Sequence, residues 1–142
     1  MLKPVAFWDS SALIPLCVTQ PHSAQAVGYF SKYRVIVWWA THVEMTSGFM
    51  RLLRDKEISE AAALRAIHEA ERLSCLWDVV EPAQKVALDA RAVLQRYPLR
   101  AADALQLAAA LAWCGGVLNE RVFLTFDRRL AEAAGLAGFM LE

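Results

Sequence analysis

The chain has 142 residues, of which 57% are hydrophobic, and 15 basic and 15 acidic residues give it a net charge of zero. The hydrophobic fraction exceeds the roughly 45–50% of an average domain, which excludes disorder and suggests that a partner or a second copy covers some apolar surface. No stretch contains the ~20 apolar residues of a membrane-spanning helix, so we expect a soluble, cytoplasmic protein. Zero net charge also excludes a strongly basic protein that coats nucleic acid.

The expected elements alternate between short apolar strands and longer helices. Residues 5–8 and 35–39 are apolar throughout, which predicts strands covered on both faces. Residues 101–113 are rich in Ala and Leu on all sides, which predicts a buried helix. In chain order we expect strand 5–8, a short helix through 13–16 that contains a proline, helix 22–31, strand 35–39, helix 41–56, helix 59–73, strand 77–80, a helix ending near 95, helix 101–113, strand 122–125, helix 128–134 and strand 139–141.

This alternation indicates an α/β fold built on a parallel sheet. The sequence contains no repeat, linker or change in composition, so residues 1–142 are expected to form a single domain. In folds of this kind ligands bind beyond the carboxyl ends of the strands. That rule indicates where to look for functional residues.

Four acidic residues lie at such positions. Asp9 directly follows the first strand, and Asp127 lies just beyond the strand at 122–125. Glu44 and Asp103 each lie in the first turn of a predicted helix. Because the carboxyl ends of parallel strands meet at one edge of a sheet, at least three of these acids should come together there.

Each acid also has a purely structural explanation. Asp9 could form an Asx turn, and Asp127 could cap the helix that begins at residue 128. Thr41 and Glu44 match a capping box, T-x-x-E, in which Glu44 would bond back to the start of its own helix. Asp103 could simply be a favourable charge at a helix N-terminus.

The four together are harder to explain structurally. Asp103 lies on a helix with almost no polar face, where a desolvated carboxylate costs several kcal/mol unless it is paired or bound to metal. Clustered carboxylates also repel one another, and a hard divalent cation such as Mg²⁺ or Mn²⁺ offsets that repulsion best. Setting these four aside leaves 11 acidic residues against 15 basic ones, so a neutral composition does not exclude a nuclease.

The segments around these acids resemble the successive motifs of PIN-domain nucleases, and most closely those of the VapC-type toxins of toxin–antitoxin pairs. The matching segments are FWDSSAL at 7–13, Thr41-x-x-Glu44, LRAADALQLA at 99–108 and LTFDRRL at 124–130. They cover essentially the whole chain in order. The bulky Trp8 and the helical Pro15 are the small departures from the family pattern.

The resemblance implies a three-layer α/β/α sandwich with a central, mostly parallel sheet. It implies endonucleolytic cleavage of RNA with Mg²⁺ or Mn²⁺, homodimerisation and inhibition by a small cognate antitoxin. By match to the motifs, Asp9, Glu44, Asp103 and Asp127 are the catalytic and metal-binding acids. Ser10 or Ser11, together with Thr125, match the hydroxyl positions that support them.

Basic residues beside the acids are candidates for contacts with RNA phosphates. Arg100, Arg128 and Arg129 are each within three residues of one of the four acids. Arg51, Arg54 and Lys56 are interpreted as a solvated helix face. No His or Ser is well placed as a nucleophile, and His42 is expected to be a half-exposed surface residue.

The aromatic and cysteine residues are interpreted as structural. Trp8, Trp38 and Trp77 are expected in the core, and Trp39 and Trp113 closer to the surface, so base stacking on tryptophan is not predicted. The three cysteines form no metal-ligand pattern and are expected to be buried, reduced thiols.

Two other functions remain open. A PIN-domain ribonuclease could serve RNA maturation or decay without an antitoxin, although a chain without an appended RNA-binding module favours the toxin. A catalytically inactive PIN-like binding module is the third possibility, but the four intact acids argue against it.

Overall fold

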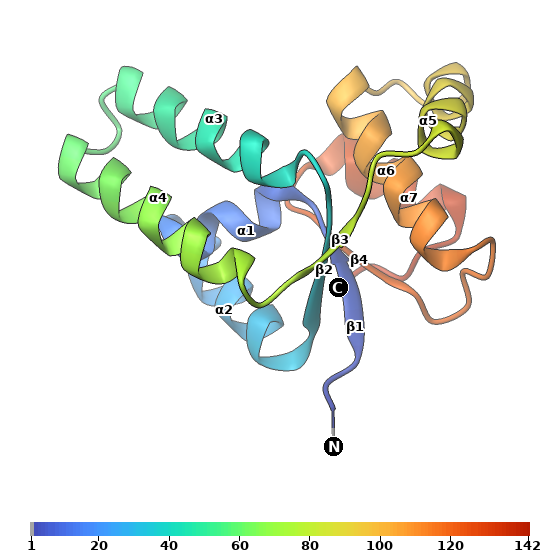
Figure 1. Cartoon of the computed structure of the whole chain (residues 1–142), viewed down its shortest axis with the longest axis horizontal. Helices are drawn as coiled ribbons and strands as arrows, with labels where there is room; N and C mark the ends of the chain where they lie inside the picture. Colours follow the sequence, from blue (N-terminus) through green and yellow to red (C-terminus); the bar gives the residue numbers. More distant parts are fainter. Residues whose placement is uncertain (1) are drawn as a thin grey trace.

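The computed structural model describes residues 2–142 and contains a parallel four-stranded sheet with helices on both faces (Figure 1). The strand order is β3-β2-β1-β4. The elements are β1 (Val5–Trp8), α1 (Ser10–Cys17), α2 (Ser23–Lys32), β2 (Arg34–Trp38), α3 (Thr41–Arg54), α4 (Glu60–Ser74), β3 (Asp78–Val80), α5 (Gln84–Arg96), α6 (Ala101–Cys114), β4 (Val122–Leu124) and α7 (Arg128–Ala137).

Strand β1 lies inside the sheet, between β2 and β4, and all its pairings are parallel. Ala6 is opposite Val35 on one side and Val122 on the other, so the strands end at nearly the same level. The backbone N–H of Asp9 extends the ladder by donating to the carbonyl of Leu124 at 3.0 Å. The carboxyl end of β1 is therefore fixed against that of β4.

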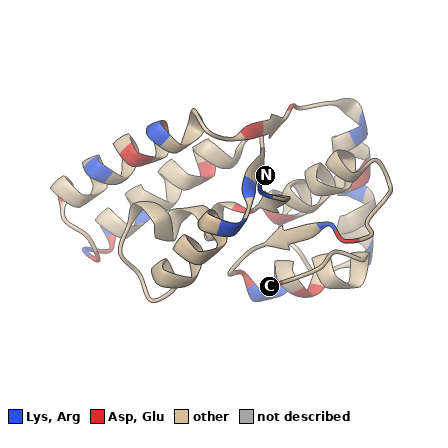
Figure 2. Ribbon diagram, turned by 90° about the horizontal axis from the view of Figure 1, so that it is seen from below, with Lys and Arg blue, Asp and Glu red and all other residues tan. Residues whose placement is uncertain are grey.

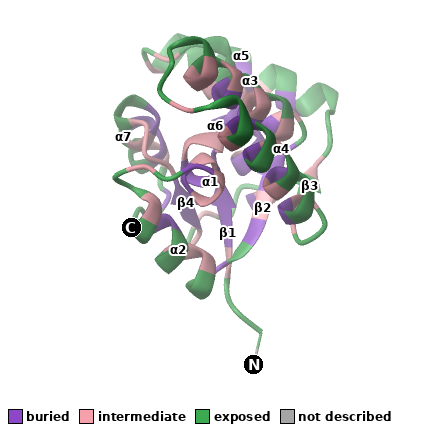
Figure 3. Ribbon diagram, turned by 90° about the vertical axis from the view of Figure 1, so that its left-hand side faces the viewer, coloured by how far each residue is buried: buried purple, intermediate pink, exposed green. Residues whose placement is uncertain are grey.

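The two faces of the sheet support separate cores because strand side chains alternate in direction. Phe7 points into one core, with buried residues of α5, α6 and α7. Ala6 and Trp8 point into the other, with buried residues of α1, α3 and α4. Figure 3 shows this buried interior enclosed by more exposed helices. The predicted three-layer α/β/α sandwich is thus confirmed.

The fold differs from the expected elements mainly at the end of the chain. The expected strand at 139–141 is reduced to a single bridge between Met140 and Val122, because Phe139 turns into the core and Gly138 ends α7 with a positive φ of 116°. The capping box, which offered a structural alternative for Glu44, is also absent. Ala40 is the N-cap of α3 and no side chain caps that helix end.

Charged residues are distributed over both halves of the molecule in the view of Figure 2. No helix within residues 2–142 is long and apolar enough to span a membrane.

Candidate metal centre and active site

The four predicted acids line one cavity of about 700 Å³ at the carboxyl edge of the sheet. Asp9 comes from the end of β1, Glu44 from α3, Asp103 from the first turn of α6, and Asp127 from the N-cap of α7. The further lining residues are Ser10, Ser11, Ile14, Ser47, Gly48, Arg51, Arg100, Ala102, Arg128 and Arg129. The expectation that these acids come together is met for all four.

Asp9 is the most buried acid of the four, with only 3% of its surface exposed. Its Oδ2 accepts hydrogen bonds from Ser11 Oγ at 2.6 Å, from Thr125 Oγ1 at 2.9 Å and from the Ser11 backbone N–H at 3.3 Å. Oδ1 has only Ser10 Oγ, at 3.4 Å. The carboxylate is thus held by one oxygen, while the other is almost unengaged.

Ser11 and Thr125 also tie the loop after β4 to the start of α1. Their hydroxyl oxygens are 3.0 Å apart, Ser11 Oγ accepts the backbone N–H of Phe126 at 2.9 Å, and Thr125 Oγ1 accepts that of Asp127 at 3.0 Å. These bonds fix the position of Asp127 relative to Asp9. The two predicted supporting hydroxyl residues therefore contact Asp9 directly.

Glu44 is oriented by a residue that the sequence analysis did not single out. Gln106 of α6 is fully buried, and its Nε2 donates to Glu44 Oε2 at 3.2 Å and to Thr41 Oγ1 at 3.1 Å. On the other side, Ser10 Oγ is 3.3 Å from Glu44 Oε1. Because one hydroxyl proton can serve only one acceptor at a time, Ser10 links Glu44 and Asp9 alternately.

Asp103 and Asp127 are both half-buried and differ in their bonding. Asp127 Oδ1 accepts the backbone N–H of Leu130 at 2.9 Å, so the capping role that was its structural alternative is present. Asp103 has no side-chain hydrogen bond to any other described residue. Asp103 is therefore the acid that hydrogen bonds from the described chain stabilise least.

The electrostatics of the cavity disfavour ionised carboxylates. Burial first, and then the charges of Asp9 and Asp103, raise the pKa of Glu44 to about 7, against the opposing hydrogen bonds from Gln106 and Ser10. Burial and the charges of Asp127 and Asp9 raise the pKa of Asp103 to about 6, with Arg100 opposing. Burial also raises the pKa of Asp9, although its hydrogen bonds act in the opposite direction. A cation bound among these acids would offset their mutual repulsion.

The donor set fits a hard divalent cation in chemistry, since Mg²⁺ and Mn²⁺ prefer carboxylate oxygens. Within residues 2–142, however, no three His, Cys, Asp or Glu side chains are gathered closely enough to hold an ion as they stand. The four carboxylates line a wider cavity instead, so an ion would have to draw them inward.

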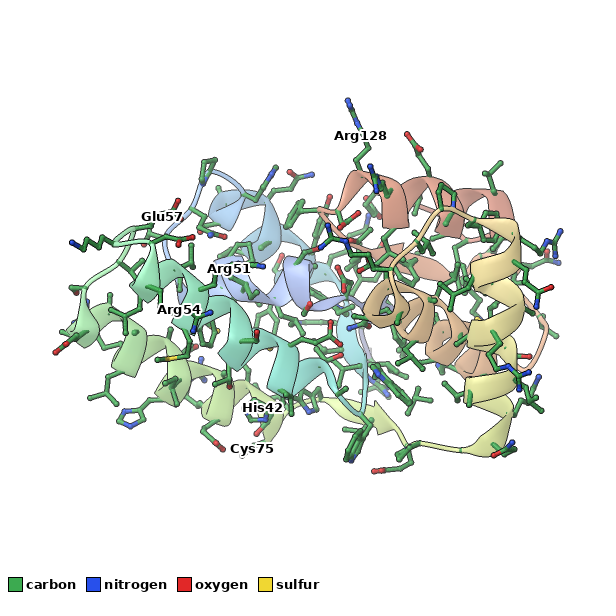
Figure 4. All side chains as sticks on the ribbon, turned by 90° about the horizontal axis from the view of Figure 1, so that it is seen from above. His42, Arg51, Arg54, Glu57, Cys75 and Arg128 are labelled. Carbon is green, nitrogen blue, oxygen red and sulfur yellow. The ribbon has the colours of Figure 1, made fainter. Side chains whose placement is uncertain are left out.

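Four arginines line this cavity, one more than expected. Arg100, Arg128 and Arg129 are there as predicted, and Arg51 joins them from α3. The interpretation of Arg51 as part of a solvated helix face was thus incomplete, because Arg51 also lines the cavity. A signal was present in the sequence, because Arg51 lies two helical turns after Glu44 and so shares its face. In Figure 4, Arg128 extends away from α7, whereas Arg51 lies between α3 and α1.

The remaining expectations for single residues have mixed outcomes. His42 is a half-exposed residue that packs against Trp77 beside Glu71 and does not line the cavity, as expected. Trp8 and Trp38 are buried and Trp39 is exposed, also as expected, while Trp77 is only half-buried. The expectation that all three cysteines are buried was wrong.

Cys114 alone is fully buried, Cys17 is intermediate and Cys75 is exposed. Cys75 lies at the C-cap of α4, where the helix ends at the surface, so its position in the chain gave no burial signal.

Fold and cavity together identify the class of the protein. The PIN domain family matches residues 6–136, and the chain belongs to this family. The comparison with curated protein sequences gave no match.

Among solved structures, the chain is similar to VapC20 of Mycobacterium tuberculosis, described as a sarcin–ricin loop cleaving toxin, with 20% identity, a TM-score of 0.66, and coverage of 95% of this chain and 96% of that one. A toxin–antitoxin complex from Klebsiella pneumoniae gives 18% identity, a TM-score of 0.64, and coverage of 89% and 90%. FitAcB from Neisseria gonorrhoeae gives 14% identity, a TM-score of 0.64, and 96% coverage of both chains. At these identities the likeness establishes the shared fold.

Proposed function

We propose that the chain is a metal-dependent endoribonuclease and the toxin of a toxin–antitoxin pair. The observation that carries the proposal is the cavity in which four carboxylates from four separate elements meet under a rim of arginines. PIN-domain proteins are nucleases, and the similar structures include an RNA-cleaving toxin and a toxin–antitoxin complex.

In the proposed site, Asp9, Glu44, Asp103 and Asp127 would hold Mg²⁺ or Mn²⁺. A bound ion of this kind lowers the pKa of water and stabilises charge on phosphate oxygens. The chain itself holds Asp9 by one oxygen through Ser11 and Thr125, which leaves Oδ1 free for a ligand. The raised pKa values of Glu44 and Asp103 mean that cation binding would release protons.

The arginines would position the RNA backbone. Arg51, Arg100, Arg128 and Arg129 surround the acids on several sides, so the phosphates flanking the scissile bond could each be contacted by a cation. Arginine suits this role because its planar guanidinium binds phosphate oxygens in pairs. None of these side chains needs to take part in bond cleavage.

The proposed partners are RNA, a small cognate antitoxin and a second copy of the chain. Exposed apolar side chains at and beside the edge strand β3 support an interface, because unpaired edges and apolar patches are usually covered in native proteins. They are Trp39, Val43, Leu76 and Val79. Light scattering coupled to gel filtration would test the homodimer.

Cleavage of mixed RNA by the purified protein, with Mg²⁺ or Mn²⁺ and an EDTA control, tests the activity. We expect cleavage that is abolished by EDTA and by the substitutions Asp9→Asn and Asp103→Asn. Asp55→Asn is the matched control, because Asp55 is an exposed carboxylate that does not line the cavity. Cleavage that persists in both site variants would refute the acids as the active site.

Absence of cleavage with every RNA, together with absence of Mn²⁺ binding by calorimetry, would instead favour an inactive binding module. Inhibition by the product of a small neighbouring reading frame would distinguish a toxin from a ribonuclease of RNA maturation or decay.

A further inference from the structure

A second cavity of about 220 Å³, here called the side cavity, adjoins the one that holds the acids. The two share the lining residues Ser11, Ile14, Gly48 and Arg51. The remaining walls of the side cavity are Pro15, Gln20, His22, Leu52 and Phe126. Among residues 2–142, no acidic residue lines it, and Arg51 is its only arginine or lysine. It therefore differs in chemistry from the cavity beside it.

Aromatic rings form one wall of the side cavity. The imidazole of His22 stacks on Phe126 with ring centroids 4.2 Å apart and planes 10° from parallel. Tyr29 stacks on the same phenyl ring, with centroids 5.9 Å apart. His22 is exposed although it is held against Phe126, and its side chain makes no capping hydrogen bond to α2. The imidazole ring of His22 is therefore not used to cap helix α2, and it leaves an aromatic surface at the side cavity.

This aromatic wall is fixed relative to the acids. Phe126 lies between Thr125 and Asp127 in the chain, and its backbone N–H donates to Ser11 Oγ, which in turn donates to Asp9. A group stacked beside Phe126 would therefore have a defined position relative to the acid-lined cavity. Arg51, which lines both cavities, lies where a chain of nucleotides would pass from one to the other.

We propose that the side cavity binds one nucleobase of the RNA strand, next to the nucleotide whose phosphodiester lies at the acids. The base stacks on the His22–Phe126 pair, because single-stranded RNA is commonly held on aromatic and histidine rings. Arg51 contacts the phosphate between the two nucleotides, and the side-chain amide of Gln20 reaches the edge of the base. This inference rests on the proposed ribonuclease activity and names a substrate subsite within it.

The size and chemistry of the side cavity favour a base. Its volume is below the roughly 300–1,000 Å³ typical of drug-sized ligand sites, which suits one flat ring system. Ile14, Pro15 and Leu52 provide apolar walls, and Gln20 provides both a donor and an acceptor. Its one cationic lining residue among those described, Arg51, is shared with the larger cavity, which disfavours a phosphate deep inside the side cavity.

Fluorescence anisotropy with a set of short labelled RNAs tests the proposal. The RNAs span the bond that the wild-type protein cleaves, and each carries one abasic nucleotide at a different position. The Asp103→Asn variant, in Mn²⁺, serves as the parent so that binding is measured without cleavage. We expect one abasic position beside the scissile bond to weaken binding about 5- to 100-fold, the range of one base–aromatic stack.

In that parent, His22→Ala should weaken binding of intact RNA by a similar factor and should cause no further loss with that abasic RNA. His22→Tyr should restore binding to intact RNA, because the stacking ring is retained. His68→Ala is the matched control, because His68 is an exposed histidine that lines neither cavity. Unchanged melting temperatures for the His22 variants would show that the fold is intact.

The outcomes separate the subsite from the activity. Suppose that the wild type cleaves RNA, but that binding is the same for every abasic RNA and His22→Ala binds RNA like its parent. The subsite is then refuted and the ribonuclease activity stands. If the wild type cleaves no RNA and the parent binds none, both proposals fail.

Discussion

Replacing Gln106 with Leu should weaken metal binding while leaving the fold almost as stable. The side chain is fully buried, and its Nε2 is the only group of α6 that holds the Glu44 carboxylate. Leu has a similar volume and cannot donate a hydrogen bond. Glu44 would then be held only by the Ser10 hydroxyl among its described partners, and the ion would have to fix the carboxylate on binding.

The magnitudes follow from the hydrogen bonds on each side of the Gln106 amide. The variant leaves the buried Thr41 hydroxyl without its partner, which costs about 1–3 kcal/mol. It also removes Gln106 Oε1, a buried oxygen that has no partner among the described residues. Loss of this unsatisfied oxygen stabilises the fold by a similar amount. The bond to Glu44 is lost as well, but this carboxylate is only half-buried and can bond to water instead, so the net change in the free energy of unfolding should be within about 1 kcal/mol. Loss of a residue that orients a metal ligand typically lowers metal affinity 10- to 100-fold.

Calorimetry with Mn²⁺ and chemical denaturation measure the two effects separately. Thr41→Val is the matched control, because it removes the other partner of Gln106 Nε2 and leaves the bond to Glu44 in place. We expect Thr41→Val to bind Mn²⁺ like the wild type. Affinity of Gln106→Leu within twofold of the wild type would refute the orienting role, or the assignment of Glu44 as a ligand.

Three further predictions concern pH, thiol reactivity and the core. The pKa values of Glu44 and Asp103, about 7 and about 6, exceed the ordinary values of 4.5 and 3.8, so the folded protein binds more protons than the unfolded chain between these limits. The melting temperature of the metal-free protein should therefore fall as the pH rises from about 5 to about 8, and Glu44→Gln should flatten the profile; a rising profile would contradict the pKa directions. With Ellman's reagent the folded protein should show one fast thiol, Cys75, and Cys75→Ser should remove the fast phase. Phe49→Ala should lower the free energy of unfolding by about 3–5 kcal/mol in urea, because Phe49 of α3 is fully buried in the core that α3 shares with α1 and α4. Val43→Ala, at a site 69% exposed on the same helix, should change it by less than about 0.5 kcal/mol.

Much of the fold could be predicted because the information is local. The apolar run at 5–8 and its counterpart in β2 have no polar face, which leaves a buried parallel strand as the simplest solution. The segment at 139–141 is also apolar throughout, but it has only three residues. Its pairing depends on how Gly138 ends α7 and where Phe139 packs, and neither is visible in three residues.

The four acids could be found from the sequence because each follows a strand or starts a helix. Their orienting residues could not, since the partner of Glu44 is Gln106, 62 positions away in the chain. Gln106 lies one helical turn after Asp103, so its place on the same face was readable, but its contact with α3 was not. The structure makes Asp9, with 3% of its surface exposed, the most buried of the four acids, whereas Asp103 is half-buried. That residues 1–142 form one domain stays a prediction.

The pairing of β1 with β4 determines at which point of chain synthesis the acid-lined cavity can form. Asp9 is bonded to Thr125 across 116 positions of the chain, and β4 supplies the backbone partner of Asp9. A ribosome adds residues from the N-terminus at roughly 5–20 per second, so Asp9 waits several seconds for that partner. A nascent chain, or one that terminates before β4, has Asp9 and Glu44 but neither Thr125 nor Asp127. The complete set of acids is thus assembled only after β4 and Asp127 have been synthesised, and folding must wait for this long-range contact.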